Sequence, residues 1–277
     1  MKIHRNPSST SMTSRKYSLI EEIELLERSL NDDSGVNQQL RLAILYVRVG
    51  SIEKARSLYS RLNESRLLNF VHQAIFNELC RSEFAELGVV SQSYYDEIYS
   101  KSEKYSTEPE KSPYISVWSK VVEIIRNANF SDCLDLGCGP GQFATFLLDS
   151  VHVKYTGIDY SSVAISMAEK RCPSGEFRCD DVILHRQNWQ LLAYDVVLML
   201  ETLEHIDRDC FLLEGVKPGV RVIASVPNFY SFSHVRVFES SEAVADRYGH
   251  FFSEMTIYRF ELSKTSVIWL VDGVKSD

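Results

Sequence analysis

Apolar residues follow two different patterns along the chain of 277 residues. Between residues 17 and 86 they recur at helical spacing, as in Ile20, Ile23 and Leu26, which predicts a run of amphipathic helices. From residue 115 onward, short apolar runs alternate with helical stretches, a pattern typical of strands and helices in succession. The pattern predicts a helix at residues 115–127 and strands at 133–136, 155–158, 176–179, 196–200 and 220–226.

This alternation predicts an α/β fold in which a mostly parallel sheet carries helices on both faces. Two further apolar runs, residues 256–262 and 266–271, are separated only by Ser263-Lys264-Thr265 and predict an antiparallel hairpin. We therefore expect a doubly wound, mostly parallel, seven-stranded sheet with a C-terminal antiparallel hairpin, preceded by a small all-α region.

Changes in composition divide the chain into four segments. Residues 1–16 are basic, rich in Ser and Thr and free of acids, which predicts a disordered tail. Residues 17–86 form the helical region, and residues 87–114, rich in Ser, Tyr, Glu and Lys, are expected to be a linker or a lid. Residues 115–277 contain the predicted sheet and form the α/β domain.

Charge and cysteine usage exclude several classes of protein. The net charge is −8, which argues against a nucleic-acid partner because an acidic chain repels a phosphate backbone. No apolar run approaches the ~18–20 residues of a membrane span. The six cysteines lack the paired spacing of a structural zinc site, and no secretory signal suggests their oxidation. We therefore expect no membrane span and a cytoplasmic location.

A glycine-rich loop follows the first predicted strand, in the sequence Leu134–Gly141 (LDLGCGPG). Glycines there allow the backbone to approach a ligand closely. Asp159 ends the next strand, where a carboxylate can accept hydrogen bonds from both ribose hydroxyls. A nicotinamide-dinucleotide site would place glycine or alanine at position 142, but this residue is Gln142, and such a site rarely has a carboxylate at the place of Asp135. The loop therefore favours a different nucleoside cofactor.

These residues resemble the first two motifs of class I S-adenosylmethionine-dependent methyltransferases. The resemblance extends over residues 115–272, and its motifs occur in the family's order. They are Asp135–Gly141, Gly157–Ser161, Asp180 with Asp181, Tyr194–Leu200, and Glu201–His205. The resemblance implies a Rossmann-like methyltransferase domain at residues 115–277, with S-adenosyl-L-methionine as the cofactor.

The resemblance also implies which residues hold the cofactor. The glycine loop would pack against its methionine part, Asp159 would hold the ribose, and Asp180 or Asp181 would accept from the adenine amino group. The expected cofactor-binding residues are Asp135, Gly137, Cys138, Gly139, Gly141, Asp159, Tyr160, Asp180, Asp181, Val182 and Glu201.

The expected catalytic residues, Glu201, Glu204 and His205, follow the fourth strand, at the edge where parallel sheets bind ligands. We expect methyl transfer to a hydroxyl oxygen of a small molecule or glycan, with His205 as a metal-free base. Glu204 can instead cap the strand and start a helix.

The Glu-x-x-Glu-His pattern is similar to that of quinone-pathway O-methyltransferases. It is also similar to that of small-RNA 2′-O-methyltransferases, which bind a metal through it and need a further histidine, here His234 or His250. A metal-dependent RNA 2′-O-methyltransferase is therefore one alternative. A cofactor-binding interaction protein with little catalytic activity is another.

The helical region resembles one tetratricopeptide repeat, although a generic helical hairpin explains it nearly as well. Its tyrosine, turn glycine and small residues fall at the family's offsets, but leucine replaces the terminal proline. These positions are Ala43, Tyr46, Gly50, Ala55, Tyr59 and Leu67. The resemblance implies a protein partner for residues 17–86.

Overall fold

The computed structural model describes the helical region only in part, and only within residues 23–58. The described residues are 23–28, 36–48, 51, 54–55, 57–58, 92–229, 231 and 233–277. The chain divides into two compact units, Met1–Val90 with Tyr230–Ser233, and Ser91–Phe229 with His234–Asp277. Among the described helices, none combines the length and apolar character that crossing a bilayer requires.

In the first unit, helix α2 (Val36–Arg48) confirms the helix expected there. Its buried face includes Ala43 and Tyr46, and the Tyr46 hydroxyl donates a hydrogen bond to Glu27, with 2.5 Å between the oxygen atoms. Of the other positions in the tetratricopeptide-like pattern, Ala55 is also buried. Gly50, Tyr59 and Leu67 lie outside the described residues, so this resemblance stays a prediction.

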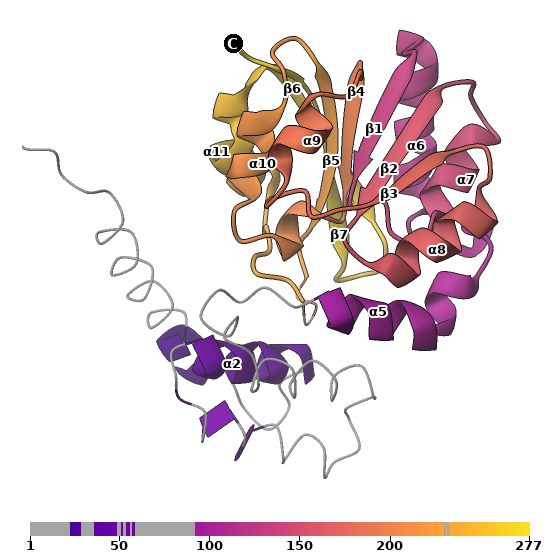
Figure 1. The fold of residues 1–277 in the computed structure, drawn as a ribbon. Coiled ribbons are helices and arrows are strands. Elements are labelled where there is room, and N and C mark those ends of the chain that lie inside the picture. Colours follow the sequence, from indigo (N-terminus) through magenta and orange to yellow (C-terminus); the bar gives the residue numbers. More distant parts are fainter. Residues whose placement is uncertain are drawn as a thin grey trace, which may run out of the picture. The chain divides into compact units, whose positions relative to one another are not determined.

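The second unit is built on a seven-stranded sheet with the strand order β3-β2-β1-β4-β5-β7-β6 (Figure 1). Strands β1 to β5 pair in parallel, and β7 runs antiparallel to both β5 and β6. This confirms the predicted fold class. The strands are β1 (Asp132–Leu136), β2 (Lys154–Asp159), β3 (Glu176–Cys179), β4 (Val196–Leu200), β5 (Arg221–Pro227), β6 (Phe252–Glu261) and β7 (Val267–Lys275).

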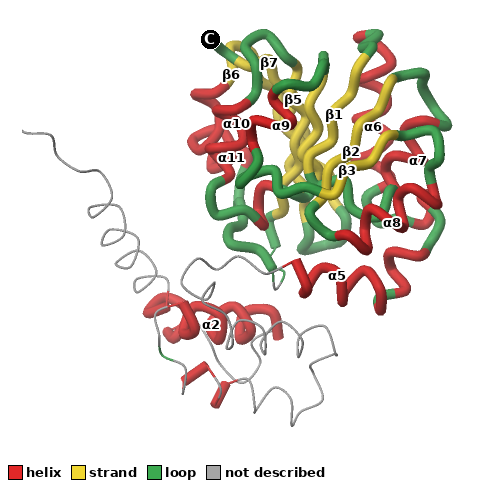
Figure 2. The backbone as a smooth tube through the Cα atoms, in the orientation of Figure 1, coloured by secondary structure: helices red, strands yellow, loops and turns green. Residues whose placement is uncertain are grey.

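Helices cover both faces of this sheet (Figure 2). Alternate side chains of β4 enter two separate apolar clusters: Val197 packs with the helices of one face and Leu198 with those of the other. Burial on both faces explains why β4 is a continuous apolar run. One layer contains α6 (Ile115–Ala128), α7 (Gln142–Leu148) and α8 (Ser162–Arg171), and the other α9 (Arg186–Gln190), α10 (Asp209–Gly215) and α11 (Ser241–Tyr248).

The structure differs from the sequence prediction at two elements. Strand β6 begins at Phe252, four residues before the expected start. The apolar pattern missed these residues because an edge strand exposes much of its surface and carries polar residues such as Ser253 and Glu254. In the segment expected to be a linker or a lid, helix α5 (Gln92–Lys101) buries Tyr94 and Ile98. Two short 3₁₀ turns, Glu103–Ser106 and Pro109–Lys111, follow it.

Candidate functional site

The glycine loop connects β1 to α7 with three residues in the left-handed backbone region. The φ angles are 87° at Gly137, 55° at Gly139 and 78° at Gly141. The loop also reaches across to β2, because the backbone amides of Gly137 and Cys138 donate to the Ile158 carbonyl at 2.7 and 3.1 Å. Glycine is therefore required here for the backbone conformation itself.

Asp159 links this loop to the turn that follows β2. Its Oδ2 accepts from the Gly139 amide and its Oδ1 from the Ser161 amide, both at 2.9 Å. Burial raises the pKa of Asp159 to about 6, although these two hydrogen bonds oppose the shift. The carboxylate is thus held rigidly where the two loops meet.

Asp135 lies on β1, beneath the same loop. Its Oδ2 accepts from the Tyr155 hydroxyl at 2.6 Å, and its Oδ1 has no hydrogen-bond partner among the described residues. Burial raises the pKa of Asp135 to about 7. A buried acceptor without a donor is costly, so this oxygen favours a ligand or water that donates to it.

Asp180 and Asp181, after β3, are engaged differently. Asp180 Oδ1 lies 2.5 Å from His185 Nδ1, and its Oδ2 accepts from Asn188 at 2.9 Å. Burial raises the pKa of Asp180, but the hydrogen bonds outweigh it and the net shift is downward. Asp181 Oδ1 accepts from two backbone amides of the next turn. Val182, the next residue, packs against the apolar cluster.

Glu201 stands directly after β4 in a left-handed conformation, with φ 52°. The Ser225 hydroxyl on the adjacent strand accepts from the Glu201 amide and donates to Glu201 Oε1, both at 2.8 Å. Burial raises the pKa of Glu201 to about 7, while Lys104 and the Tyr114 hydroxyl lower it. Its carboxylate is therefore oriented by β5 and by the segment after α5.

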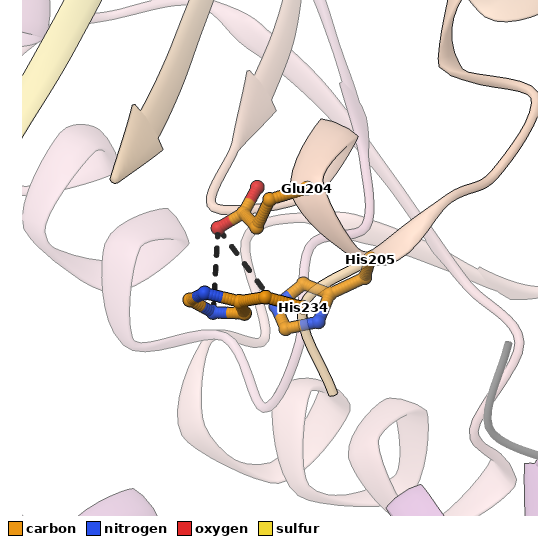
Figure 3. Close-up of side chains that lie close together, drawn as sticks. All are labelled: Glu204, His205 and His234. Carbon is orange, nitrogen blue, oxygen red and sulfur yellow. Dashed lines mark ion pairs between the residues drawn. The ribbon is translucent and has the colours of Figure 1, made fainter. Parts of the chain in front are cut away.

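Glu204, His205 and His234 come together as a cluster (Figure 3). Glu204 is fully buried, and neither carboxylate oxygen has a hydrogen-bond partner among the described residues. Its Oε1 lies 3.8 Å from His205 Nε2 and 4.0 Å from His234 Nε2. Burial and the neighbouring Glu201 raise the pKa of Glu204.

The donor set of this cluster fits a divalent cation. His234 Nδ1 lies 3.1 Å from the Phe229 carbonyl, and because a carbonyl only accepts, Nδ1 carries a proton, while Nε2 faces Glu204. Such an outer hydrogen bond is usual for metal-binding histidines, and a carboxylate with imidazoles suits transition metals. Metal–ligand bonds of ~2.0–2.2 Å require the three groups to draw slightly closer.

Of the two downstream histidines, only His234 reaches this cluster. His250 is exposed on the 3₁₀ turn Gly249–Phe251, with its ring 4.0 Å from the Phe251 ring. The sequence alone did not distinguish between the two histidines, because each follows β5 in a stretch without a clear pattern of apolar residues.

The segment expected to be a linker or a lid is dense in tyrosines, and the sequence predicts that it contributes to acceptor specificity. In the structure, the Tyr95 ring lies 5.4 Å from the Tyr160 ring and 6.0 Å from the His205 ring. The Tyr99 hydroxyl lies 3.5 Å from where a side chain on Gly139 would begin. Helix α5 therefore contributes to the candidate site.

The segment after α5 is fastened to the same unit by two side chains. The Gln142 amide donates to the Thr107 carbonyl at 3.0 Å. The Arg171 guanidinium donates to the carbonyls of Pro140, at 3.1 Å, and Tyr105, at 2.9 Å. Residues of the expected lid are thus bound to α7 and α8.

Residues 133–216 match a protein-family model described as "Methyltransferase domain". The chain carries a methyltransferase domain. The matched segment includes the glycine loop, Asp159 and Glu204, whereas α5 precedes it and His234 follows it.

The methyltransferase domain is also similar to known proteins. A demethylmenaquinone methyltransferase of Thermotoga maritima is 42% identical over 66 residues, which are 23% of this chain and 29% of that protein. The chain thus matches less than a third of that relative's length. The structure of the methyltransferase domain of a bacterial Hen1 is 18% identical, with a TM-score of 0.46. The match covers 58% of this chain and 97% of that domain. The Synechocystis magnesium protoporphyrin IX methyltransferase with bound SAH is 17% identical, with a TM-score of 0.46. The match covers 59% of this chain and 84% of that protein.

Proposed function

We propose that this chain transfers a methyl group from S-adenosyl-L-methionine to a hydroxyl oxygen of a small molecule or glycan. The observation that carries the proposal is Asp159. A buried carboxylate joins the glycine loop to the turn after β2, at the carboxyl ends of two parallel strands. A parallel sheet binds nucleosides at this edge, and the segment matches a methyltransferase domain.

The residues present fit the cofactor. Asp159 in its ionised form accepts from the ribose hydroxyls, and the glycine loop admits the methionine part at close range. Asp180 or Asp181 accepts from the adenine amino group. The cofactor, when bound, supplies a methyl group on a positively charged sulfur, and the buried carboxylates Asp135 and Glu201 favour this charge.

His205 is the proposed base. Its ring is part-exposed beside Tyr95, and its Nε2 lies near the buried Glu204 carboxylate, which stabilises the imidazolium that forms when it takes the acceptor's proton. General base catalysis of this kind contributes ~10²–10⁴-fold.

The cofactor site is tested by Asp159→Ala. The variant loses hydrogen bonds from the ribose to a charged acceptor, each worth ~1.5–3 kcal/mol. We therefore expect S-adenosylhomocysteine binding to weaken at least ~100-fold, as measured by calorimetric titration. Asp149→Ala, an exposed acid at the end of α7, is the control. Unchanged affinity in a folded Asp159→Ala protein contradicts the assignment.

The base is tested by His205→Ala with the acceptor found by a labelling screen. The screen incubates the protein and methyl-labelled cofactor with extracted metabolites and glycans, and mass spectrometry identifies the product. We expect methyl transfer to fall ~100-fold while S-adenosylhomocysteine affinity stays unchanged, because a base acts on the acceptor. His250→Ala is the matched control and keeps full activity. Wild-type turnover in His205→Ala rejects the role.

A second candidate is a metal-dependent methyltransferase, with RNA 2′-hydroxyls among its possible acceptors. The unpaired oxygens of Glu204 and the orientation of His234 favour it. Glu204, His205 and His234 would hold the cation, and a bound cation polarises an acceptor oxygen. In that case a chelator abolishes activity and added Mn²⁺ or Zn²⁺ restores it. His234→Ala then lowers methyl transfer as much as His205→Ala does. With a metal-free base, chelation changes nothing.

A third candidate is a cofactor-binding interaction protein, in which residues 17–86 recruit a protein partner. This function requires cofactor binding without methyl transfer. Binding of S-adenosylhomocysteine, together with no labelled product from any acceptor in the screen, selects it over the two enzymes.

A further inference from the structure

We infer that Asp96 is a positioning residue for the cofactor: it holds the turn that carries Asp159 and keeps α5 over the bound nucleoside. The inference rests on the proposed function, because it concerns the same cofactor site. Asp96 lies on α5, outside the segment that matches the methyltransferase domain.

The contact is a chain of hydrogen bonds from α5 into the cofactor turn. Asp96 Oδ1 accepts from the Ser161 hydroxyl at 2.6 Å and from the Val163 amide at 3.3 Å. Ser161 is fully buried, and its amide donates to Asp159 Oδ1 at 2.9 Å. The Ser161 hydroxyl also accepts from the Ala164 amide at 3.1 Å. Asp96 therefore fixes Ser161, which in turn fixes Asp159.

Two tyrosines of the same helix reach the residues around Asp159. One turn along α5 from Tyr95, the Tyr99 hydroxyl approaches Gly139, whose amide donates to Asp159 Oδ2. The Tyr95 ring packs in a T-shaped arrangement with the ring of Tyr160, which follows Asp159 in sequence. Asp96 lies between these two tyrosines in sequence. Its hydrogen bonds to Ser161 and Val163, at the N-terminal end of α8, therefore set the position of both rings. Figure 1 shows α5 beside α8 at this end of the sheet.

Asp96 also acts on Asp159 by charge. Its carboxylate raises the pKa of Asp159, in addition to the larger effect of burial. The titratable groups that face Asp159 are Asp96 and Tyr99 on α5, Asp135 on β1, Cys138 in the glycine loop, Tyr160 in the following turn and Cys179 on β3. All six are acids, so none offsets a negative charge on Asp159.

Geometry and charge can be separated with two substitutions. Asp96→Asn keeps an oxygen that accepts from Ser161 but removes the charge, whereas Asp96→Ala removes both. Glu97→Gln is the matched control, since Glu97 is the next residue of α5 and pairs with Lys101 of its own helix at 2.5 Å.

The experiment is calorimetric titration of each full-length protein with S-adenosylhomocysteine between pH 5 and pH 8. Wild-type affinity is expected to fall as pH decreases through about 6, where Asp159 takes up a proton. Asp96→Ala weakens binding at pH 8 about tenfold, an effect of the size that loss of one charged hydrogen bond produces. Asp96→Asn keeps the wild-type affinity at pH 8. The pH at which its affinity falls is lower than in the wild type, because removal of the negative charge lowers the pKa of Asp159. Glu97→Gln matches the wild type.

Wild-type affinity of Asp96→Ala at every pH overturns the inference. An unchanged pH profile in Asp96→Asn also overturns it, and this second readout decides the matter if circular dichroism shows that Asp96→Ala is unfolded. If the wild type itself binds no S-adenosylhomocysteine, the proposed function fails and the inference fails with it. Failure of the inference alone is recognised by normal wild-type binding.

Discussion

Four buried or half-buried carboxyl groups meet at the carboxyl ends of β1, β2 and β4: Asp135, Asp159, Glu201 and Glu204. Burial raises the pKa of each of them. A tyrosine hydroxyl holds Asp135, two backbone amides hold Asp159, and a serine holds Glu201, whereas the carboxylate of Glu204 has no hydrogen-bond partner among the described residues. A cationic ligand relieves this crowding of negative charge, and an anionic ligand aggravates it.

The first prediction concerns the pH dependence of stability. The folded pKa of Asp135, about 7, exceeds the usual value of ~3.9 in unfolded chains, so between these values the folded state holds a proton that the unfolded state has lost. Stability from this group is therefore present at low pH and is lost as pH rises through about 7. Asp135→Asn should raise the melting temperature at pH 8 by ~2–5 °C and reduce its dependence on pH.

Differential scanning fluorimetry of the ligand-free protein between pH 6 and pH 8 makes this measurement. Asp149→Asn, on the surface, controls for the change in net charge. Equal melting curves for Asp135→Asn and the wild type at pH 8 contradict the prediction.

At the scale of the residue, sequence reasoning places Asp159 at the end of β2 and Glu204 just after β4, and the structure has them there, because a parallel sheet gathers those strand ends at one edge. It does not choose between His234 and His250, since the path of the loop after β5 is set by tertiary contacts such as the bond from the Val235 amide to the Glu204 carbonyl, at 2.7 Å. It also does not find Asp96, whose partner Ser161 is 65 residues away.

At the scale of the element, the central strands can be predicted from the sequence because burial on both faces leaves uninterrupted apolar runs. The predicted bounds of β3 and β4 agree with the structure at both ends. Helix α5 is less readable because its surface is polar and only Tyr94 and Ile98, spaced by one helical turn, are buried. That single pair was the available signal.

A second prediction concerns the packing of α7 on α8. A side chain at Gly141 would lie 2.8 Å from the Ala168 Cα atom, and φ there is +78°. Gly219 has a similar φ, +79°, with nothing within 4 Å. Gly219→Ala should therefore cost only the ~1–2 kcal/mol of left-handed strain, and Gly141→Ala a further ~1–3 kcal/mol of overpacking.

The comparison is made by urea unfolding of both variants. Because backbone strain is common to the pair, the difference between them isolates the contact with α8. Equal unfolding free energies would show that α8 moves aside without cost.

At the scale of the whole molecule, the two compact units predict separable folding. A chain beginning at residue 88 contains the whole second unit, together with Tyr230–Ser233, which group with the first unit. We expect it to unfold in one cooperative transition and to bind S-adenosylhomocysteine within ~2-fold of the full-length affinity, since domains usually fold independently.

Size-exclusion chromatography, thermal unfolding and calorimetric titration test this shortened chain. Loss of acceptor specificity with retained cofactor binding assigns residues 17–86 a role in recognition. An insoluble product, or one that does not bind the cofactor, shows instead that the helical region belongs to a shared core.

The position of β7 between β5 and β6 has a consequence for synthesis on the ribosome. Both neighbours precede β7 in the chain, so a nascent polypeptide exposes the unpaired edge of β5 until the last strand has emerged. Unpaired edges with apolar side chains, such as Val222 and Val226, are prone to pair with other chains. A premature stop before Val267 therefore leaves the five parallel strands complete, but it also leaves the edge of β5 exposed, so that the polypeptide becomes a substrate for chaperones and proteases.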